Sequence, residues 1–154
     1  YIADTLNIEV HQANSFVAFY WGSMLVGRLA GSALLQSAKP PVILKSCAAI
    51  SILLIIISIN TSGYVAVWSM IMVGLCNAIM FATIFSLSIS GLGKFTTRAS
   101  GLLSTAIVGG AVISFLMGLV RDSFTWQIAF VIPALCYLYI LFYGINGYKS
   151  KSTQ

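Results

Sequence analysis

The sequence predicts an all-α, polytopic membrane protein with five transmembrane helices. Hydrophobic residues make up 59% of the 154 residues, charged residues only 7%, and the mean hydropathy is +0.98. A soluble domain carries about 25% charged residues, so these few cannot cover the surface of a soluble fold. A spanning helix needs about 20 apolar residues, so the length accommodates about five or six spans with short loops. Water-soluble classes, including soluble enzymes, are therefore excluded.

The first half of the chain contains an aqueous segment and two expected spans. Residues 1–13 hold two of the three acidic side chains and are expected to form a loop outside the membrane. The first span is expected over residues 14–35, because a Lys-Pro-Pro break follows it at 39–41. The second is expected over residues 42–59, which contain a run of isoleucine and leucine interrupted only by serine.

The second half contains three more spans and a polar tail. An Asn-Thr-Ser-Gly turn precedes the third span, over residues 64–88, and a Gly-Leu-Gly-Lys break follows it. The fourth span is expected over residues 100–120, closed by an Arg-Asp-Ser sequence, and the fifth over residues 126–143. Residues 148–154 are expected to form the tail. The five spans then form one unit over residues 14–147, and none resembles a signal peptide.

The basic residues predict the orientation of these spans. Six of them lie in alternate loops and the tail: Lys39, Lys45, Lys94, Arg98, Lys149 and Lys151. The opposite side has Arg121 beside Asp122, and the acidic residues Asp4 and Glu9. The positive-inside rule then places the N-terminal segment outside and the C-terminus in the cytoplasm. Because the basic residues are scattered singly, we expect no nucleic-acid partner.

No pattern in the sequence indicates a metal or a cofactor. The cysteines, Cys47, Cys76 and Cys136, each stand alone within apolar stretches, and the single histidine, His11, has no second ligand near it in sequence. A disulfide framework or a metal site needs paired cysteines or a cysteine–histidine cluster. We therefore expect neither, and no cofactor.

The third span carries the first candidate substrate-binding residues, Asn77 and Phe81. Asn77 lies halfway along this span, where an amide is costly unless it bonds another helix or faces a water-filled cavity. Phe81 follows one helical turn later, so an amide and an aromatic ring share a face. That pair suits a sugar, whose hydroxyls bond the amide and whose apolar face packs on the ring. The alternative is that Asn77 bonds a neighbouring helix and Phe81 only packs.

The third candidate, Arg28, is the only charged residue in the interior of an expected span, since Lys45 lies at the beginning of the second span. Leaving it unpaired there costs at least about 2.5–3.5 kcal/mol, and the acidic residues all lie at the outer side. It must therefore extend toward the membrane surface, meet helix-end carbonyls or water, or pair with a carboxylate outside this sequence. The unpaired cation, the odd number of spans and the absence of an initial methionine predict a fragment, with at least one helix before Tyr1.

Small residues recur in the first and fourth spans at the spacing of a helical turn. They are Gly27 and Gly31 in the first, and Gly110, Ser114 and Gly118 in the fourth. Small faces let helix backbones approach closely inside a membrane, so both spans are expected to pack against other helices. The second and fifth spans lack interior glycine and are expected to contact lipid.

Several of these stretches resemble one transporter family. They are YWGSMLVGRLAGSALL, GLCNAIMFATIFSLSISGLGKFTTRASGLL, AIVGGAVISFLMGLVRD and FVIPALCYLYILFYGINGYK. They are similar to the C-terminal half of a sugar transporter of the major facilitator superfamily, from the branch with the fucose and glucose/galactose permeases. The resemblance covers essentially the whole chain. It implies that the five spans are helices eight to twelve of twelve, and that the third span is helix ten, which lines the central cavity.

The resemblance also implies the function. We expect part of a secondary active transporter that takes up a hexose-type sugar by cation (proton) symport with alternating access, in a bacterial inner membrane. Asn77, Phe81 and Arg28 would contribute to substrate binding. The partners would be the sugar, the coupling cation, the lipid bilayer and the missing N-terminal half, which would supply the proton-carrying carboxylate. The alternatives are a drug or metabolite exporter of the same superfamily, and a small stand-alone membrane channel or subunit.

The sequence departs from the family pattern in two helices. Alanine, at Ala82, stands where the family usually has a proline after the aromatic of helix ten, and a usual proline is also absent around Ser114 and Phe115. Proline kinks a helix, so both helices are expected to be straighter here.

Overall fold

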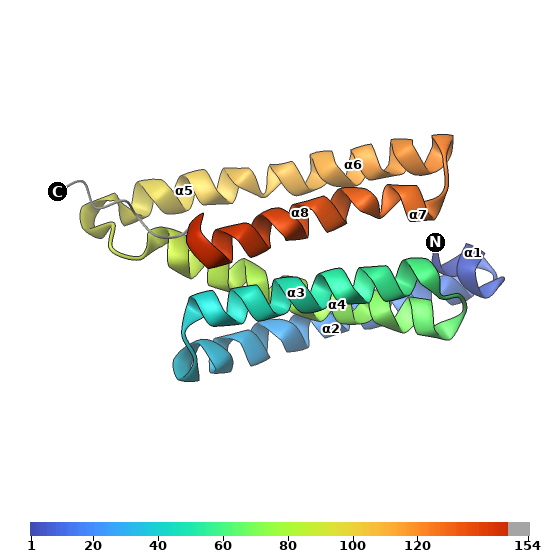
Figure 1. Cartoon of the computed structure of the whole chain (residues 1–154), viewed down its shortest axis with the longest axis horizontal. Helices are drawn as coiled ribbons and strands as arrows, with labels where there is room; N and C mark the ends of the chain where they lie inside the picture. The colour runs from blue at the N-terminus through green and yellow to red at the C-terminus, as the bar shows by residue number, and fades with distance from the viewer. Residues whose placement is uncertain (148–154) are drawn as a thin grey trace.

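The computed structural model describes residues 1–147, and these form an elongated bundle of helices (Figure 1). The tail expected over residues 148–154, with Lys149 and Lys151, lies outside the described residues. The elements, in chain order, are α1 (Ile2–Leu6), α2 (Val10–Ser37), α3 (Pro40–Asn60), α4 (Tyr64–Ile89), η1 (Gly93–Phe95), α5 (Thr96–Ala106), α6 (Val108–Ser123), α7 (Trp126–Ala129), α8 (Val131–Phe142) and η2 (Tyr143–Gly147).

The boundaries of these helices follow from proline and glycine. Proline occupies the first turn of α3, where its missing N–H costs no hydrogen bond. Gly63 has a φ of +70° in the turn between α3 and α4, a conformation that other residues rarely adopt. Between α7 and α8 the regular helix is distorted at Phe130, which keeps a right-handed helical conformation, because Pro133 has no N–H to donate to the carbonyl of Ala129. The fifth expected span is therefore irregular at this point but continuous over Trp126–Asn146.

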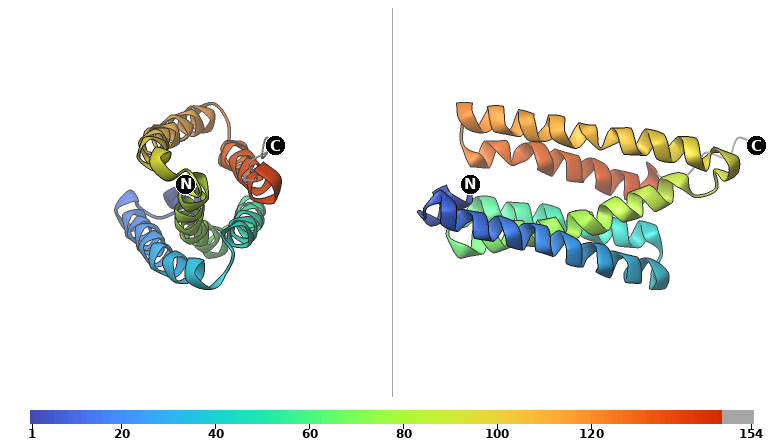
Figure 2. Two further views of the ribbon diagram at one scale, coloured as in Figure 1. Left: turned by 90° about the vertical axis from the view of Figure 1, so that its left-hand side faces the viewer. Right: turned by 180° about the vertical axis from the view of Figure 1, so that it is seen from behind.

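The core lies between α3 and α4, with α2 on the other side of α4 and α8 on α3. The end-on view in Figure 2 shows α5 and α6 on the opposite side of the bundle from α2. The largest fully buried side chains come from the two central helices and are Leu44, Ile55, Val67, Met80, Thr83 and Ser51. The second expected span, α3, is therefore buried along one face and exposed along the other, at Leu53 and Ile56 for example.

Helices α2 and α4 approach closely through glycine. A Cβ atom on Gly27 would lie 2.5 Å from the carbonyl oxygen of Leu75, and one on Gly31 would lie 3.4 Å from Ile79. The Ser23 hydroxyl also donates a hydrogen bond to the Ile71 carbonyl, at 2.9 Å. The small-residue spacing in the first expected span therefore marks a packed face, as predicted.

The glycines of the fourth expected span behave differently. Nothing lies within 4 Å of a Cβ placed on Gly110 or Gly118, and α5 and α6 contain no buried residue among those the structure describes. The prediction that this span packs through its glycines is not met within residues 1–147. Helix α4 runs unbroken through Ala82, the position where the resemblance implies that the family usually has a proline.

Four described stretches are long and apolar enough to cross a membrane: Pro40–Asn60, Tyr64–Ile89, Gly93–Ser123 and Trp126–Asn146. Helix α2, which contains the first expected span, is long enough but falls outside this set. Its middle carries glycine, serine and Arg28, which lower its hydropathy.

Candidate functional site

A large cavity lies between α2 and α4 on one side and α6 and α8 on the other. Its volume is about 870 Å³, and most of its lining side chains are apolar. Four lining residues carry polar groups near the middle of the helices: Tyr20, Asn77, Ser114 and Tyr137. An apolar cavity with a few convergent polar groups is the usual form of a small-molecule site.

Asn77 is the predicted site residue that the structure places in this cavity. It is the fourteenth of the 26 residues of α4, counted from Tyr64, and its side chain is half-buried. Val73, one turn earlier on α4, lines the same cavity, so this face of the helix points into the open space. The Asn77 amide makes no hydrogen bond within residues 1–147. Both its donor and acceptor groups are therefore free to bind a ligand or water.

Phe81 lies outside the cavity lining, although it follows Asn77 by one turn. Its side chain is 51% exposed, and its ring centroid lies 6.4 Å from that of Phe85. The two rings form a small exposed aromatic surface on α4. Asn77 and Phe81 therefore lie one turn apart on the same helix, but only Asn77 lines the described cavity.

Arg28 is also exposed and also lies outside the cavity. It follows Gly27, whose backbone contacts α4, and consecutive helical residues point in directions about 100° apart. Arg28 is thereby turned away from the α2–α4 contact, and it forms no ion pair with any residue in the described range. The guanidinium is available to a partner outside these residues.

Sequence reasoning did not identify the other polar residues of the cavity. Ser114 belongs to the small-residue face of α6, which was interpreted as a packing face but lines the open space. The spacing of Gly110 and Ser114 was a usable signal for that face, because both residues line the cavity. Tyr20 and Tyr137 come from distant segments, and nothing in the sequence signals that they line the same cavity.

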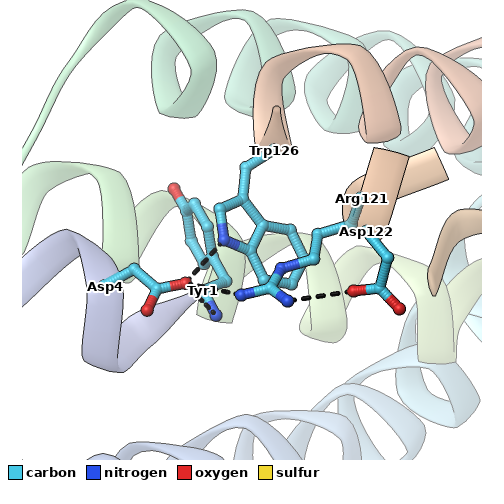
Figure 3. A network of polar contacts seen from close by, with 5 residues as sticks. All are labelled: Tyr1, Asp4, Arg121, Asp122 and Trp126. Carbon is cyan, nitrogen blue, oxygen red and sulfur yellow. Dashed lines mark hydrogen bonds and ion pairs between the residues drawn. The ribbon is translucent and has the colours of Figure 1, made fainter. Parts of the chain in front are cut away.

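One end of the bundle carries a network of charged and aromatic side chains (Figure 3). Asp4 accepts hydrogen bonds from Trp126 Nε1 at 2.8 Å and from Arg121 at 3.4 Å. Arg121 also pairs with Asp122 at 3.0 Å, and its guanidinium lies 5.1 Å from the centre of a Trp126 ring. The hydrogen bond from Trp126 lowers the pKa of the Asp4 carboxyl from its ordinary value. The network fastens α1 to the turn between α6 and α7.

A second, smaller pocket lies beside this network; we call it the end pocket. Its volume is about 270 Å³. It is lined by Tyr1, Asp4, Thr5, Ser58, Ile59, Thr61, Ser62, Trp126, Gln127 and Phe130. Four of these residues, Tyr1, Asp4, Trp126 and Phe130, also line the large cavity. The two spaces are therefore neighbours that share part of a wall.

The three cysteines are free thiols, Cys47 and Cys76 being buried on neighbouring helices. Across residues 1–147, no group of three or more histidine, cysteine, aspartate or glutamate side chains comes together in a way that would hold a metal ion. The polar groups near the middle of the large cavity are an amide and hydroxyls, which suit a neutral hydrogen-bonding solute, while the charged residues Asp4 and Arg121 line its end.

The chain is similar to curated sugar transporters. It is 44% identical over 134 residues to a glucose/galactose transporter of Brucella abortus biovar 1 (strain 9-941), covering 87% of this chain and 32% of the relative. It is 42% identical over 154 residues to a putative glucose/galactose transporter of Helicobacter pylori (strain J99), covering 97% of the chain and 38% of the relative. An L-fucose-proton symporter of Escherichia coli (strain K12) is 32% identical over 120 residues. No family model matches.

Solved structures show the same likeness. A crystal structure of a major facilitator superfamily transporter in the outward conformation aligns over 94% of this chain and 35% of its own, with a TM-score of 0.83 and 27% identity. One of the Escherichia coli fucose:proton symporter aligns over 98% of this chain and 37% of its own, with a TM-score of 0.89 and 26% identity. The chain thus spans about a third of the length of these relatives, matching their C-terminal portion, and is a membrane-embedded, multi-pass helical protein.

Proposed function

Because the chain matches the C-terminal portion of major facilitator superfamily sugar transporters in sequence and fold, we propose that it forms the C-terminal part of a secondary active transporter. The complete protein takes up a hexose-type sugar by proton symport, with alternating access around a site in the middle of the membrane. It resides in a bacterial inner membrane with the N-terminal segment of this chain outside and the C-terminus in the cytoplasm.

The observation that carries this proposal is the position of Asn77. Its free amide faces a cavity of about 870 Å³ halfway along the 26-residue apolar helix α4. An amide is both donor and acceptor, so it can bond two functions of a sugar at once. Ser114 and Tyr137 line the same cavity and offer hydroxyls. A ligand hydrogen-bonded there replaces the partners that a mid-membrane amide otherwise lacks.

Phe81 and Arg28 act in this proposal at the surface that meets the N-terminal half. Both are exposed within the described residues, and Phe81 continues the face of α4 that begins at Asn77. A ring one turn from the amide covers the apolar face of the sugar from the side of the other half. Arg28 pairs there with a carboxylate that this chain lacks. The absence of buried residues in α5 and α6, within residues 1–147, supports an extensive second surface of this kind.

Proton coupling in this proposal depends on the N-terminal half. The three acidic residues, Asp4, Glu9 and Asp122, lie in or next to the α1 segment and the last turn of α6, far in sequence from the middle of any apolar helix. A carboxylate that binds a proton during transport must exchange between both sides of the membrane. This chain therefore supplies part of the sugar-binding wall and leaves the coupling group to its partner.

The test is sugar binding by the complete transporter with Asn77→Ala or Phe81→Ala. Removing one hydrogen bond or one ring contact is expected to weaken equilibrium binding of radiolabelled glucose or galactose by about three- to tenfold. Matched controls are Asn14→Ala and Phe19→Ala, which alter exposed residues of α2 outside the cavity lining. Normal membrane insertion with unchanged affinity in both site variants would mean that the two residues only pack.

A lipophilic exporter is a second candidate, because most of the cavity lining is apolar. Such a protein would bind lipophilic cations in the same space. A competition assay separates the two proposals. If sugars fail to displace one another and cells export lipophilic cations, the exporter proposal replaces the hexose proposal.

A further inference from the structure

We propose that the thiols of Cys47 and Cys76 form a two-coordinate binding site for a soft divalent metal ion, Hg(II). The site lies in the core between α3 and α4, and the proposed transport function makes no use of it. Its two ligands are 29 residues apart in the sequence, so the packing of the two helices brings them together. Both belong to one helical hairpin in the interior of the chain, so the site does not depend on the residues at either end.

The turn between α3 and α4 places the two cysteines at the same level of this hairpin. The Ser58 hydroxyl donates a hydrogen bond to the Ala66 carbonyl at 3.1 Å. These two residues lie four positions before and four positions after residue 62, so the antiparallel helices pair about that residue. Cys47 lies 15 positions before it and Cys76 lies 14 positions after it. One position amounts to about 1.5 Å along a helix axis, so the two side chains start at matching depths.

Both cysteines point into the contact between the two helices. Cys47 precedes Ser58 by 11 residues, which is close to three turns of about 3.6 residues. It therefore lies on the side of α3 that Ser58 turns toward α4. Cys47 is 8% exposed and Cys76 is 7% exposed, and both belong to one buried cluster. Their thiols lie beside each other and interact directly, so the two sulfur atoms form a pair.

A buried hydroxyl lies beside this pair. Ser51 follows Cys47 by one turn on α3 and is fully buried. Its Oγ makes no hydrogen bond of good geometry within residues 1–147, although it lies beside the Cys76 thiol. Buried polar groups normally have a partner, and hydrogen bonds to a charged acceptor are roughly twice as strong as those to a neutral one. The Ser51 hydroxyl therefore gains a strong acceptor when a metal ion displaces the proton of Cys76.

The charge balance favours a divalent ion in this apolar core. Mercuric chloride is a small neutral molecule, so it enters apolar surroundings without the cost of an isolated ion. Each sulfur replaces one chloride on the metal as its thiol loses a proton. One mercuric chloride and two thiols thus give a neutral mercury dithiolate, two chloride ions and two protons, with no change of oxidation state. A monovalent ion held by two thiolates would leave a net negative charge, which burial disfavours.

The number and type of ligands separate Hg(II) from the common divalent metals. Zn(II) in structural sites takes four ligands, and Mg(II) and Ca(II) take oxygen ligands. Within residues 1–147 no third histidine, cysteine, aspartate or glutamate side chain joins the two thiols. Hg(II) is a soft ion that two thiolates on opposite sides satisfy, and thiolates favour soft ions. The pair therefore suits Hg(II) and not Zn(II).

The experiment measures the mercury that the complete transporter retains after dialysis against excess glutathione. An isolated thiol loses Hg(II) to this competitor, whereas a preformed pair retains it because the second sulfur binds within the same molecule. Cys47→Ala and Cys76→Ala are each expected to retain one Hg(II) ion fewer per transporter than the wild type. Cys136→Ala, which removes the third thiol, is the matched control and is expected to retain as much as the wild type. The Zn(II) retained is expected to be equal in all four proteins.

A second measurement uses the wild type alone, so it does not depend on how well the variants fold. Trypsin cuts after Lys45 and Lys94 and releases residues 46–94 as one peptide that contains both proposed ligands. Cys136 is released separately, in residues 122–149. After loading and dialysis against glutathione, mass spectrometry is expected to find one Hg(II) ion in place of two protons on the first peptide, and no metal on the second.

The proposal is overturned if both alanine variants, folded by the criterion of their thermal unfolding, retain as much Hg(II) as the wild type. It is also overturned if the peptide of residues 46–94 carries no mercury, or if the retained mercury is lost in Cys136→Ala. None of these measurements involves sugar, so their outcome is separate from the test of the proposed function with Asn77→Ala and Phe81→Ala.

Discussion

Replacing Gly27 with alanine tests whether the α2–α4 contact depends on the absence of a side chain. The added Cβ would lie 2.5 Å from the Leu75 carbonyl oxygen and 3.1 Å from the Ala78 Cβ. The first neighbour is backbone, which cannot rotate away, so the helices must separate. Overpacking of this kind costs about 1–3 kcal/mol. Gly22→Ala, at a site with nothing within 4 Å, provides the matched control.

Both substitutions gain the same helix propensity, roughly 0.5–1 kcal/mol, so the difference between them isolates the steric cost. We expect Gly22→Ala to be more stable than Gly27→Ala by about 1–3 kcal/mol. A domain of this size changes its midpoint of thermal unfolding by about 2–4 °C per kcal/mol. The assay is thermal unfolding of the detergent-solubilised protein, followed by circular dichroism. Equal midpoints, or a higher midpoint for Gly27→Ala, would refute the close-packing argument.

Three further predictions concern single interactions. Ser23→Ala removes the hydrogen bond to Ile71 and is expected to lower stability by about 0.6 kcal/mol, a typical value between membrane helices, measured as above. The lowered pKa of Asp4 means that its carboxylate stabilises the folded chain above its ordinary pKa of 3.8. The midpoint temperature of thermal unfolding of the wild type should therefore fall relative to that of Asp4→Asn as the pH falls through and below that value. A difference between the two midpoints that does not change with pH would contradict this. Pro133→Ala is expected to join α7 and α8 into one helix and raise the helical signal in circular dichroism; an unchanged signal would place the cause of the break elsewhere.

The long helices were predictable because they depend on local sequence. Proline or glycine separates α2 from α3, α3 from α4 and α4 from α5, so these helix ends lie beside those residues. The packed face of α2 was also predictable, since Gly27 and Gly31 recur at one helical turn. The same reasoning failed for Gly110, because the spacing of small residues identifies a helix face but does not show whether another helix packs against that face. In the described chain that face is open.

The site was only partly predictable for a related reason. Asn77 could be identified from its polarity in an apolar helix, and the structure places it in the cavity wall. The end network could not, because Asp4 in α1 and Arg121 in the last turn of α6 are 117 residues apart in the sequence. Which loops meet at one end of a bundle depends on how the helices are arranged. Local patterns of charge or hydropathy do not contain that information.

The contact between α2 and α4 has a consequence for synthesis of the protein. Ser23 and its partner Ile71 are separated by 48 residues, which a ribosome adds in about 2–10 s. Helix α2 falls outside the strongly apolar spans, yet it packs on α4 and not chiefly on its neighbour α3. It therefore leaves the ribosome before the helix that holds it exists. Until α4 has been synthesised, lipid or the insertion machinery must shield the glycine face of α2. Helix α2 therefore reaches its packed position only after the later helix α4 has been inserted.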